Sequence, residues 1–325
     1  MLAPNESNCK RRMARRPQSV AWLRTKPGVA KHPILCYFCS RTAPTRSLRI
    51  TAMTLPSMAT RMQPETPPPA AAACADYVSV IVPIYNEAAH VEELLRSIQA
   101  APVAKEIVIV DDGSTDGTRE KLLALPSAEN VTLVFHQKNC GKGAAVRTGL
   151  RYAHGEYVLI QDSDLEYDPQ DYAALLRPLQ EGKANVVYGV RPNRPERGLR
   201  FFLGAKLLTH LTNLLYGAGI QDEATCYKVF RRSLIANLPL ECRRFEFCPE
   251  VTAKLCRLGE TIWEVPISYQ PRSTEQGKKI RHSDGWLAIW TLVRFRFVRR
   301  RSFAPSPAGN NNPPFPVALF RLPSR

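Results

Sequence analysis

The chain has 325 residues, 44% hydrophobic and 23% charged, a composition that excludes a fully disordered protein. The net charge of +16 is concentrated at the N-terminus, because residues 1–63 carry twelve Lys and Arg against a single acid, Glu6. The remainder holds 33 basic and 28 acidic side chains, so we expect no nucleic-acid partner for the folded part. Nine cysteines, an odd number that lacks the paired spacings of a small secreted scaffold, favour reduced thiols in a cytoplasmic setting.

Both ends of the chain are predicted to be disordered. Residues 1–75 are basic and Pro-rich and lack any helix or strand period, so they cannot bury enough apolar surface to offset the entropy of ordering them. They read either as a transit peptide or as an extension from an upstream start. Residues 302–325, which include a run of Pro and Asn, are predicted as a second disordered tail.

Between these tails, apolar β-branched runs alternate with segments of helical period. The predicted strands are residues 77–84, 106–110, 131–135, 156–160 and 184–189. The predicted helices are residues 88–101, 116–125, 143–154 and 169–181. This alternation predicts an α/β domain over residues 76–283, with a mostly parallel sheet that helices cover on both faces. Ligand-binding residues are then expected at the carboxyl ends of the strands.

Acidic residues follow two of these strands. Asp111 and Asp112 end the second strand, and a turn needs only one of them as a cap, so the other is available for a nucleobase or ribose. Asp162 and Asp164 end the fourth strand, where two neighbouring carboxylates raise each other's pKa unless a cation lies between them. A solvated turn would also explain them, but a divalent cation on a substrate diphosphate removes the repulsion.

Basic residues follow two other strands. Lys142 lies between glycines at the start of a predicted helix, where backbone N–H groups and the helix dipole favour an anion. Arg191 follows the fifth strand and reads as a phosphate ligand or as a surface residue.

In this order, the motifs PIYNE, VDDGSTDGT, NCGKGAAVRTG and IQDSDLEYDP resemble the family 2 glycosyltransferases of GT-A fold. The resemblance covers residues 76–298 and is closest to the subgroup typified by dolichol-phosphate mannose synthase and bacterial polyprenyl-phosphate glycosyltransferases. It implies transfer of a sugar, with inversion, from GDP-mannose or a UDP-sugar to a polyprenyl or dolichyl phosphate.

The resemblance also implies roles for individual residues. Asp162 and Asp164 would be catalytic and would hold Mg²⁺ or Mn²⁺. The predicted nucleotide-sugar ligands are Pro83, Asn86, Glu87, Asp111, Asp112, Lys142 and Arg191. The predicted acceptor-phosphate ligands are Arg272, Lys278 and Lys279. Asp222 and Glu250 fall in stretches that face the acceptor, and they are the candidate catalytic bases.

Two alternatives stay open at this point. A polyprenyl phosphate is already ionised at neutral pH and needs no base, whereas a sugar hydroxyl would need Asp222 or Glu250 to take its proton. A non-catalytic binding protein that keeps the fold is the other alternative, and the intact Asp111, Asp162 and Asp164 argue against it.

Residues 284–301 are predicted to form a helix with aromatic and basic character. On a helical wheel, Trp286, Trp290 and Phe297 share one stripe, and arginines flank it. This pattern suits a helix in the bilayer interface, and a helix packed on the sheet with a solvated basic end is the alternative. No run of 18 apolar residues predicts a membrane-spanning helix. We therefore expect a cytoplasmic protein held peripherally at the cytoplasmic face of a membrane.

Overall fold

A computed structural model describes residues 76–126, 128–192, 199–271, 282–299 and 317–321. The N-terminal extension and the predicted phosphate ligands Arg272, Lys278 and Lys279 lie outside these residues.

The described residues form one sheet with the strand order β7-β5-β6-β4-β1-β2-β3-β8. The strands are β1 Val78–Ile84, β2 Lys105–Asp111, β3 Val131–His136, β4 Tyr157–Ile160, β5 Val186–Val190, β6 Lys228–Arg231, β7 Ile262–Pro266 and β8 Val317–Arg321. β1 pairs in parallel with both β2 and β4, whereas β6 and β8 run antiparallel to their neighbours. The prediction of a mostly parallel sheet is therefore confirmed.

Helices cover both faces of this sheet. They are α1 Val91–Ala100, α2 Thr118–Leu123, α3 Lys142–Gly149, α4 Tyr172–Gln180, α5 Leu199–Tyr216, α6 Arg232–Ile235, α7 Phe247–Leu258 and α8 His282–Phe297, with 3-10 turns at Leu150–Tyr152 and Pro169–Asp171. Because successive strand side chains point to opposite faces, Val80 packs in the core with α1 and α4, and Ile81 packs with α3 and α7. This explains why β1 is buried along its whole length.

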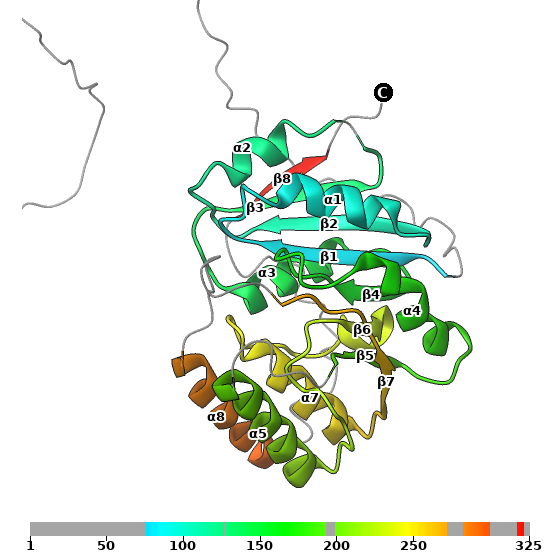
Figure 1. The fold of residues 1–325 in the computed structure, drawn as a ribbon, viewed down its shortest axis with the longest axis vertical. Coiled ribbons are helices and arrows are strands. Elements are labelled where there is room, and N and C mark those ends of the chain that lie inside the picture. The colour runs from blue at the N-terminus through cyan, green and yellow to red at the C-terminus, as the bar shows by residue number, and fades with distance from the viewer. Residues whose placement is uncertain (1–75, 127, 193–198, 272–281, 300–316, 322–325) are drawn as a thin grey trace, which may run out of the picture. The chain divides into compact units, whose positions relative to one another are not determined.

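A third apolar cluster joins α5 and α8 to α7. Leu292 and Phe295 of α8 are fully buried there, together with Ala253 of α7, and the Tyr216 hydroxyl of α5 donates to the carbonyl of Leu292 at 2.5 Å. α5 and α8 lie side by side, with α7 between them and the sheet (Figure 1). The helix predicted at 284–301 corresponds to α8, which begins at His282 and ends at Phe297, and one of its faces packs on the domain.

The prediction of a disordered tail over residues 302–325 is wrong for Val317–Arg321. This segment is β8, which pairs antiparallel with β3 from Val317 opposite His136 to Arg321 opposite Thr132. A run of five residues is too short for its period to distinguish a strand from a tail, and the exposed edge of β3 supplies the pairing.

Candidate active site

The loops that carry the predicted site residues meet at one edge of the sheet. β1 lies between β2 and β4, and all three strands run in the same direction, with Ile84 opposite Asp111 and Ile81 opposite Ile160. The loops after these strands therefore leave the sheet together. This is the switch point at which open α/β sheets bind ligands.

The loops after β1 and β2 are joined by side chains of the two predicted motifs. The backbone N–H of Asn86 donates to Ser114 Oγ at 2.9 Å, and its Oδ1 accepts from the backbone N–H of Thr115 at 2.8 Å. The N–H of Glu87 donates to Thr118 Oγ1 at 2.9 Å. Asn86 has φ of 50°, a left-handed conformation that asparagine tolerates. Part of the sequence motif thus holds the two loops together.

Asp111 is fully buried and paired with an arginine that sequence reasoning missed. Arg119 Nε and Nη2 donate to Asp111 Oδ2 at 2.9 and 2.7 Å, and the N–H of Ser114 donates to Oδ1 at 3.1 Å. Arg119 also donates to the carbonyl of His136 at 2.7 Å, which ties β2 to β3. Its only sequence signal is its place in the first turn of the helix after the acidic motif.

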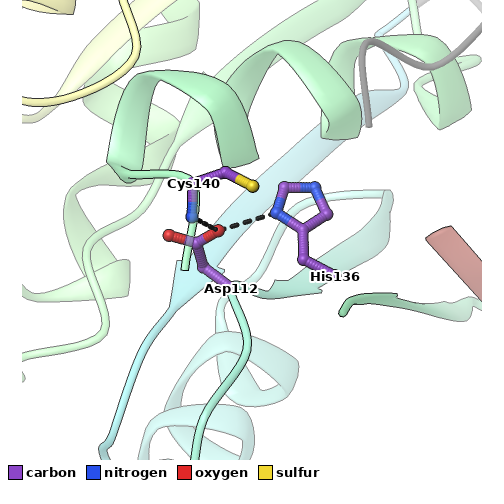
Figure 2. Close-up of side chains that lie close together, drawn as sticks. All are labelled: Asp112, His136 and Cys140. Carbon is purple, nitrogen blue, oxygen red and sulfur yellow. Dashed lines mark hydrogen bonds and ion pairs between the residues drawn. The ribbon is translucent and has the colours of Figure 1, made fainter. Parts of the chain in front are cut away.

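Asp112 belongs to a buried network with His136 and Cys140 (Figure 2). Their possible metal-ligating atoms all lie within 4.8 Å of one another. However, Asp112 Oδ1 contacts His136 Nδ1 at 2.7 Å and accepts from the N–H of Cys140 at 2.8 Å, and Oδ2 accepts from the N–H of Gly141 at 2.7 Å.

The other groups of this network are also engaged. His136 Nε2 lies 2.9 Å from Thr148 Oγ1. Burial raises the pKa of the Cys140 thiol, and Asp112 adds to that shift, so the protonated form is favoured. Asp112 therefore fastens the loop before α3, and its role as a nucleotide ligand stays a prediction.

The Asp162 and Asp164 carboxylates follow β4 and are partly exposed. The fully buried Gln161 sets the chain direction here, because its Oε1 accepts from the Tyr172 and Tyr227 hydroxyls at 2.6 and 2.7 Å. Its Nε2 donates to the carbonyl of Asp162 at 2.9 Å. Asp164 Oδ1 accepts from the N–H of Glu166 at 3.3 Å. These hydrogen bonds hold the backbone that carries the Asp162 and Asp164 carboxylates.

Lys142 places an ammonium group on one of these carboxylates. Its Nζ lies 2.5 Å from Asp162 Oδ1 and 3.0 Å from Cys226 Sγ. Burial acts to lower the pKa of Lys142, but the charge of Asp162, its hydrogen bond and the nearby Cys226 and Cys248 together outweigh burial and hold this pKa well above its usual value. The chain can bring Lys142 this close because Gly141, with φ of 97°, lies where a Cβ would collide with the carbonyl oxygen of Arg243.

These residues fit a hard divalent cation. Asp162 and Asp164 offer carboxylate oxygens at a strand end that is partly open to solvent, and Asp162 already attracts a positive charge in the form of Lys142. A cation at this site would share Asp162 with the ammonium group.

Two residues predicted to act separately form a pair. Arg191 Nε and Nη2 donate to Asp222 Oδ2 and Oδ1 at 2.6 and 2.7 Å, and only 13% and 11% of the two side chains are exposed. The guanidinium also lies over the ring of Tyr269, 5.3 Å from its centroid. The positive charge of Arg191 and the negative charge of Asp222 thus neutralise each other.

Glu250 is fully buried within α7. Its Oε1 accepts from Lys254 Nζ at 2.6 Å and from the N–H of Glu241 at 2.7 Å, and its Oε2 accepts from the N–H of Cys242 at 2.9 Å. These bonds hold the segment before α7 against the helix. Glu250 thus has a structural position, and its role as a catalytic base stays a prediction.

Comparison with known proteins agrees with this arrangement. The family model described as glycosyl transferase family 2 matches residues 79–238, which contain β1 to β6 and the clustered loops. The chain is 34% identical over 210 residues to the undecaprenyl-phosphate 4-deoxy-4-formamido-L-arabinose transferase of Pseudomonas paraeruginosa, a match that covers 62% of this chain and 60% of that protein.

Two further curated proteins match at 29% identity. Over 235 residues the chain resembles the dodecaprenyl-phosphate galacturonate synthase of Rhizobium johnstonii, with 70% of this chain and 69% of that protein covered. Over 242 residues it resembles the low-salt glycan biosynthesis hexosyltransferase Agl6 of Haloferax volcanii, with 71% and 56% covered. The chain thus spans less than two thirds of the Pseudomonas and Haloferax relatives.

Solved structures share the fold. Glucosyl-3-phosphoglycerate synthase from Mycobacterium tuberculosis, solved with Mn²⁺, uridine diphosphate and phosphoglyceric acid, superposes with a TM-score of 0.55 at 22% identity, covering 69% of this chain and 80% of that one. Mannosyl-3-phosphoglycerate synthase from Rubrobacter xylanophilus gives 0.55 at 24% identity, with 70% and 74% covered. With its ordered motifs, its sheet and the match over residues 79–238, the chain belongs to glycosyl transferase family 2.

Proposed function

We propose that this enzyme transfers a sugar from a nucleotide-sugar donor to a polyprenyl phosphate. The curated relatives named for undecaprenyl phosphate and dodecaprenyl phosphate support this acceptor class. Which sugar and which base the donor carries is left to the experiment below, with GDP-mannose and UDP-sugars as the candidates.

The main support for a polyprenyl-phosphate acceptor is that both candidate bases, Asp222 and Glu250, are already bound to basic side chains. Asp222 is held by two hydrogen bonds from Arg191, and Glu250 is buried against Lys254. A sugar hydroxyl must lose a proton as it attacks, so that reaction needs an available base. A phosphate oxygen already carries negative charge. The geometry therefore favours an acceptor that supplies its own nucleophilic anion over the hydroxyl alternative.

On the donor side, we assign Asp162 and Asp164 to holding Mg²⁺ or Mn²⁺. Such an ion, when bound, counters the negative charge that grows on the departing nucleoside diphosphate. Among the described residues, Lys142 reaches the same place, because its ammonium contacts Asp162 and its backbone begins α3. It would meet the diphosphate through its ammonium group, because the N–H groups of Gly143 and Ala144 in the first turn of α3 already donate to the carbonyls of Arg244 and Arg243.

The nucleoside would lie over the joined loops after β1 and β2. In this proposal Pro83, Asn86 and Glu87 would contact the nucleoside at the start of that surface, and the buried Asp111, paired with Arg119, would lie beneath it. Arg191, which Asp222 holds in place, would attract the phosphate of the acceptor, together with the predicted ligands Arg272, Lys278 and Lys279.

The test is a panel of donors and acceptors. Purified protein would receive GDP-mannose, UDP-glucose or UDP-N-acetylglucosamine with Mg²⁺ or Mn²⁺, and either a polyprenyl phosphate or soluble sugars, with products identified by mass spectrometry. We expect a glycosylated lipid phosphate from one donor. A glycosylated soluble sugar with no lipid product would establish the hydroxyl alternative. No product from any donor, with nucleotide binding intact, would favour a binding protein.

A further inference from the structure

The outer faces of α5 and α8 carry large apolar side chains. On α5 these are Leu203, Leu207 and Leu214, which are 55%, 57% and 73% exposed. On α8 they are Trp286, Trp290 and Phe297, which are 75%, 61% and 79% exposed. The two helices lie side by side (Figure 1), and these six exposed side chains are outside the apolar cluster that the helices share, so we call them the α5–α8 face.

This exposure is unusual, because both helices have already buried an apolar stripe. α8 packs Ala288, Leu292 and Phe295 inward, and α5 packs Leu208 and Leu211 into the same cluster. A surface helix of a protein in water is expected to be polar on the side opposite its buried stripe. An exposed apolar patch of this kind marks an interaction surface.

The charges on these helices are basic. α5 contains no Asp or Glu, and the one acidic residue of α8, Asp284, is buried and pairs with Arg244 at 3.2 Å. Lys206, Arg294 and Arg296 lie on the same helices, and Arg294 pairs with the neighbouring Glu241 at 2.9 Å. The apolar face is thus accompanied by a positive charge.

We propose that the α5–α8 face lies on the surface of an anionic lipid bilayer. Leucine, tryptophan and phenylalanine side chains would enter the interface, and Lys and Arg would meet the lipid phosphates. A second copy of this chain is a weaker match for the charge, because a two-fold contact would set each basic face against itself. In this proposal the face acts as a peripheral anchor. None of the helices in the described part of the chain meets the length and hydropathy that a membrane span requires.

The face is connected to the candidate site by a short series of contacts. Asp284, near the start of α8, pairs with the Arg244 side chain, and the carbonyl of Arg244 accepts from the N–H of Gly143 at 3.2 Å. Gly143 follows Lys142 in the chain. For its role in presenting a lipid acceptor the inference rests on the proposed function, but lipid binding itself requires no turnover.

The test uses the full-length chain and vesicles that contain no polyprenyl phosphate and no donor. Phosphatidylcholine vesicles with phosphatidylglycerol would be compared with pure phosphatidylcholine vesicles by co-sedimentation. One variant combines Trp286→Ser, Trp290→Ser and Phe297→Ser, and a second combines Leu203→Ser, Leu207→Ser and Leu214→Ser. Trp263→Ser on the edge strand β7, which is 44% exposed, is the matched control.

We expect each triple variant to bind the anionic vesicles at least about tenfold more weakly, and the control to bind like the wild type. Because the replaced side chains are exposed, the melting temperature should stay near that of the wild type. A second readout separates this face from the basic residues 1–75. Brominated lipids should quench the fluorescence of the wild type, and quenching should fall in a Trp286→Phe, Trp290→Phe variant.

Two results would overturn the proposal. One is unchanged vesicle binding in both triple variants, which would show that another part of the chain binds the lipid. The other is a wild-type dimer that the triple variants convert to monomers without any change in lipid binding, which would make the face a contact between copies. Neither result depends on catalytic activity, so the proposed function could stand or fail separately.

Discussion

Replacing Lys142 by methionine should make the metal site easier to fill while making the protein less stable. The substitution keeps an unbranched apolar chain of about the same volume and removes the ammonium that lies 2.5 Å from Asp162. In the wild type a divalent cation must share or displace that positive charge. In Lys142→Met the Asp162 carboxylate has no neighbouring ammonium, so Mn²⁺ should bind more tightly in the absence of nucleotide.

The magnitudes follow from the burial of the pair. Removing one partner of a fully buried ion pair costs about 3 to 5 kcal/mol. The Lys142 and Asp162 side chains are 12% and 15% exposed, so this pair is not fully buried. We therefore expect a smaller loss, of about 2 kcal/mol, in the free energy of unfolding. For Mn²⁺ without nucleotide we expect affinity to rise at least about tenfold, since a unit charge near 4 Å contributes about 4 kcal/mol even at the dielectric of a protein surface.

The assay is urea unfolding and Mn²⁺ titration by electron paramagnetic resonance, both without donor. Lys138→Met, at an exposed position in the same loop, is the control and should change neither quantity. The double variant Lys142→Met, Asp162→Asn should recover part of the lost stability, because no unpaired charge is left. Mn²⁺ affinity that is equal or weaker in Lys142→Met would refute competition between the ammonium and the metal.

Three more predictions concern single carboxylates. Asp164→Asn should abolish transfer and keep the fold, with a chelator acting on the wild type in the same way, and full activity of the variant at limiting metal would remove Asp164 from the metal site. Glu250→Gln should lower the free energy of unfolding by about 3 kcal/mol, because it breaks the buried pair with Lys254, and leave the activity per folded molecule unchanged. A loss of activity at wild-type stability would restore Glu250 as a base. Glu223 is fully buried, and burial raises its pKa from 4.5 to about 7. The folded state therefore keeps its proton to higher pH than the unfolded state, and stability should fall by about 3 kcal/mol as pH rises through that window. In urea unfolding at several pH values, Glu223→Gln should lack this fall, and parallel curves for the two proteins would contradict the assignment.

The sequence alone determined the frame of this protein. Five strands and their helices are readable because burial on both faces of a parallel sheet forces continuous β-branched runs, and a helix covering them shows a helical period. The same rule places Asp111 and Asp162 at strand ends, and hence at one edge of the sheet, without any structure. The ordered motifs then identify the family.

Tertiary structure decided which of those side chains are available for chemistry. Lys142 lies on Asp162, Arg119 on Asp111 and Arg191 on Asp222 only because the folded chain brings residues from different elements together. No local period encodes such pairs, since each partner alone looks like a ligand or a surface charge.

Burial and edge pairing are likewise properties of the whole fold. Glu250 has the sequence context of a base and becomes a buried structural group because the segment before α7 folds over it. β8 exists because β3 has an edge to pair with. From the sequence alone, any of the leucines of α5 could belong to the core. The packing of α5 against α7 and α8 decides that Leu203, Leu207 and Leu214 lie outside the core.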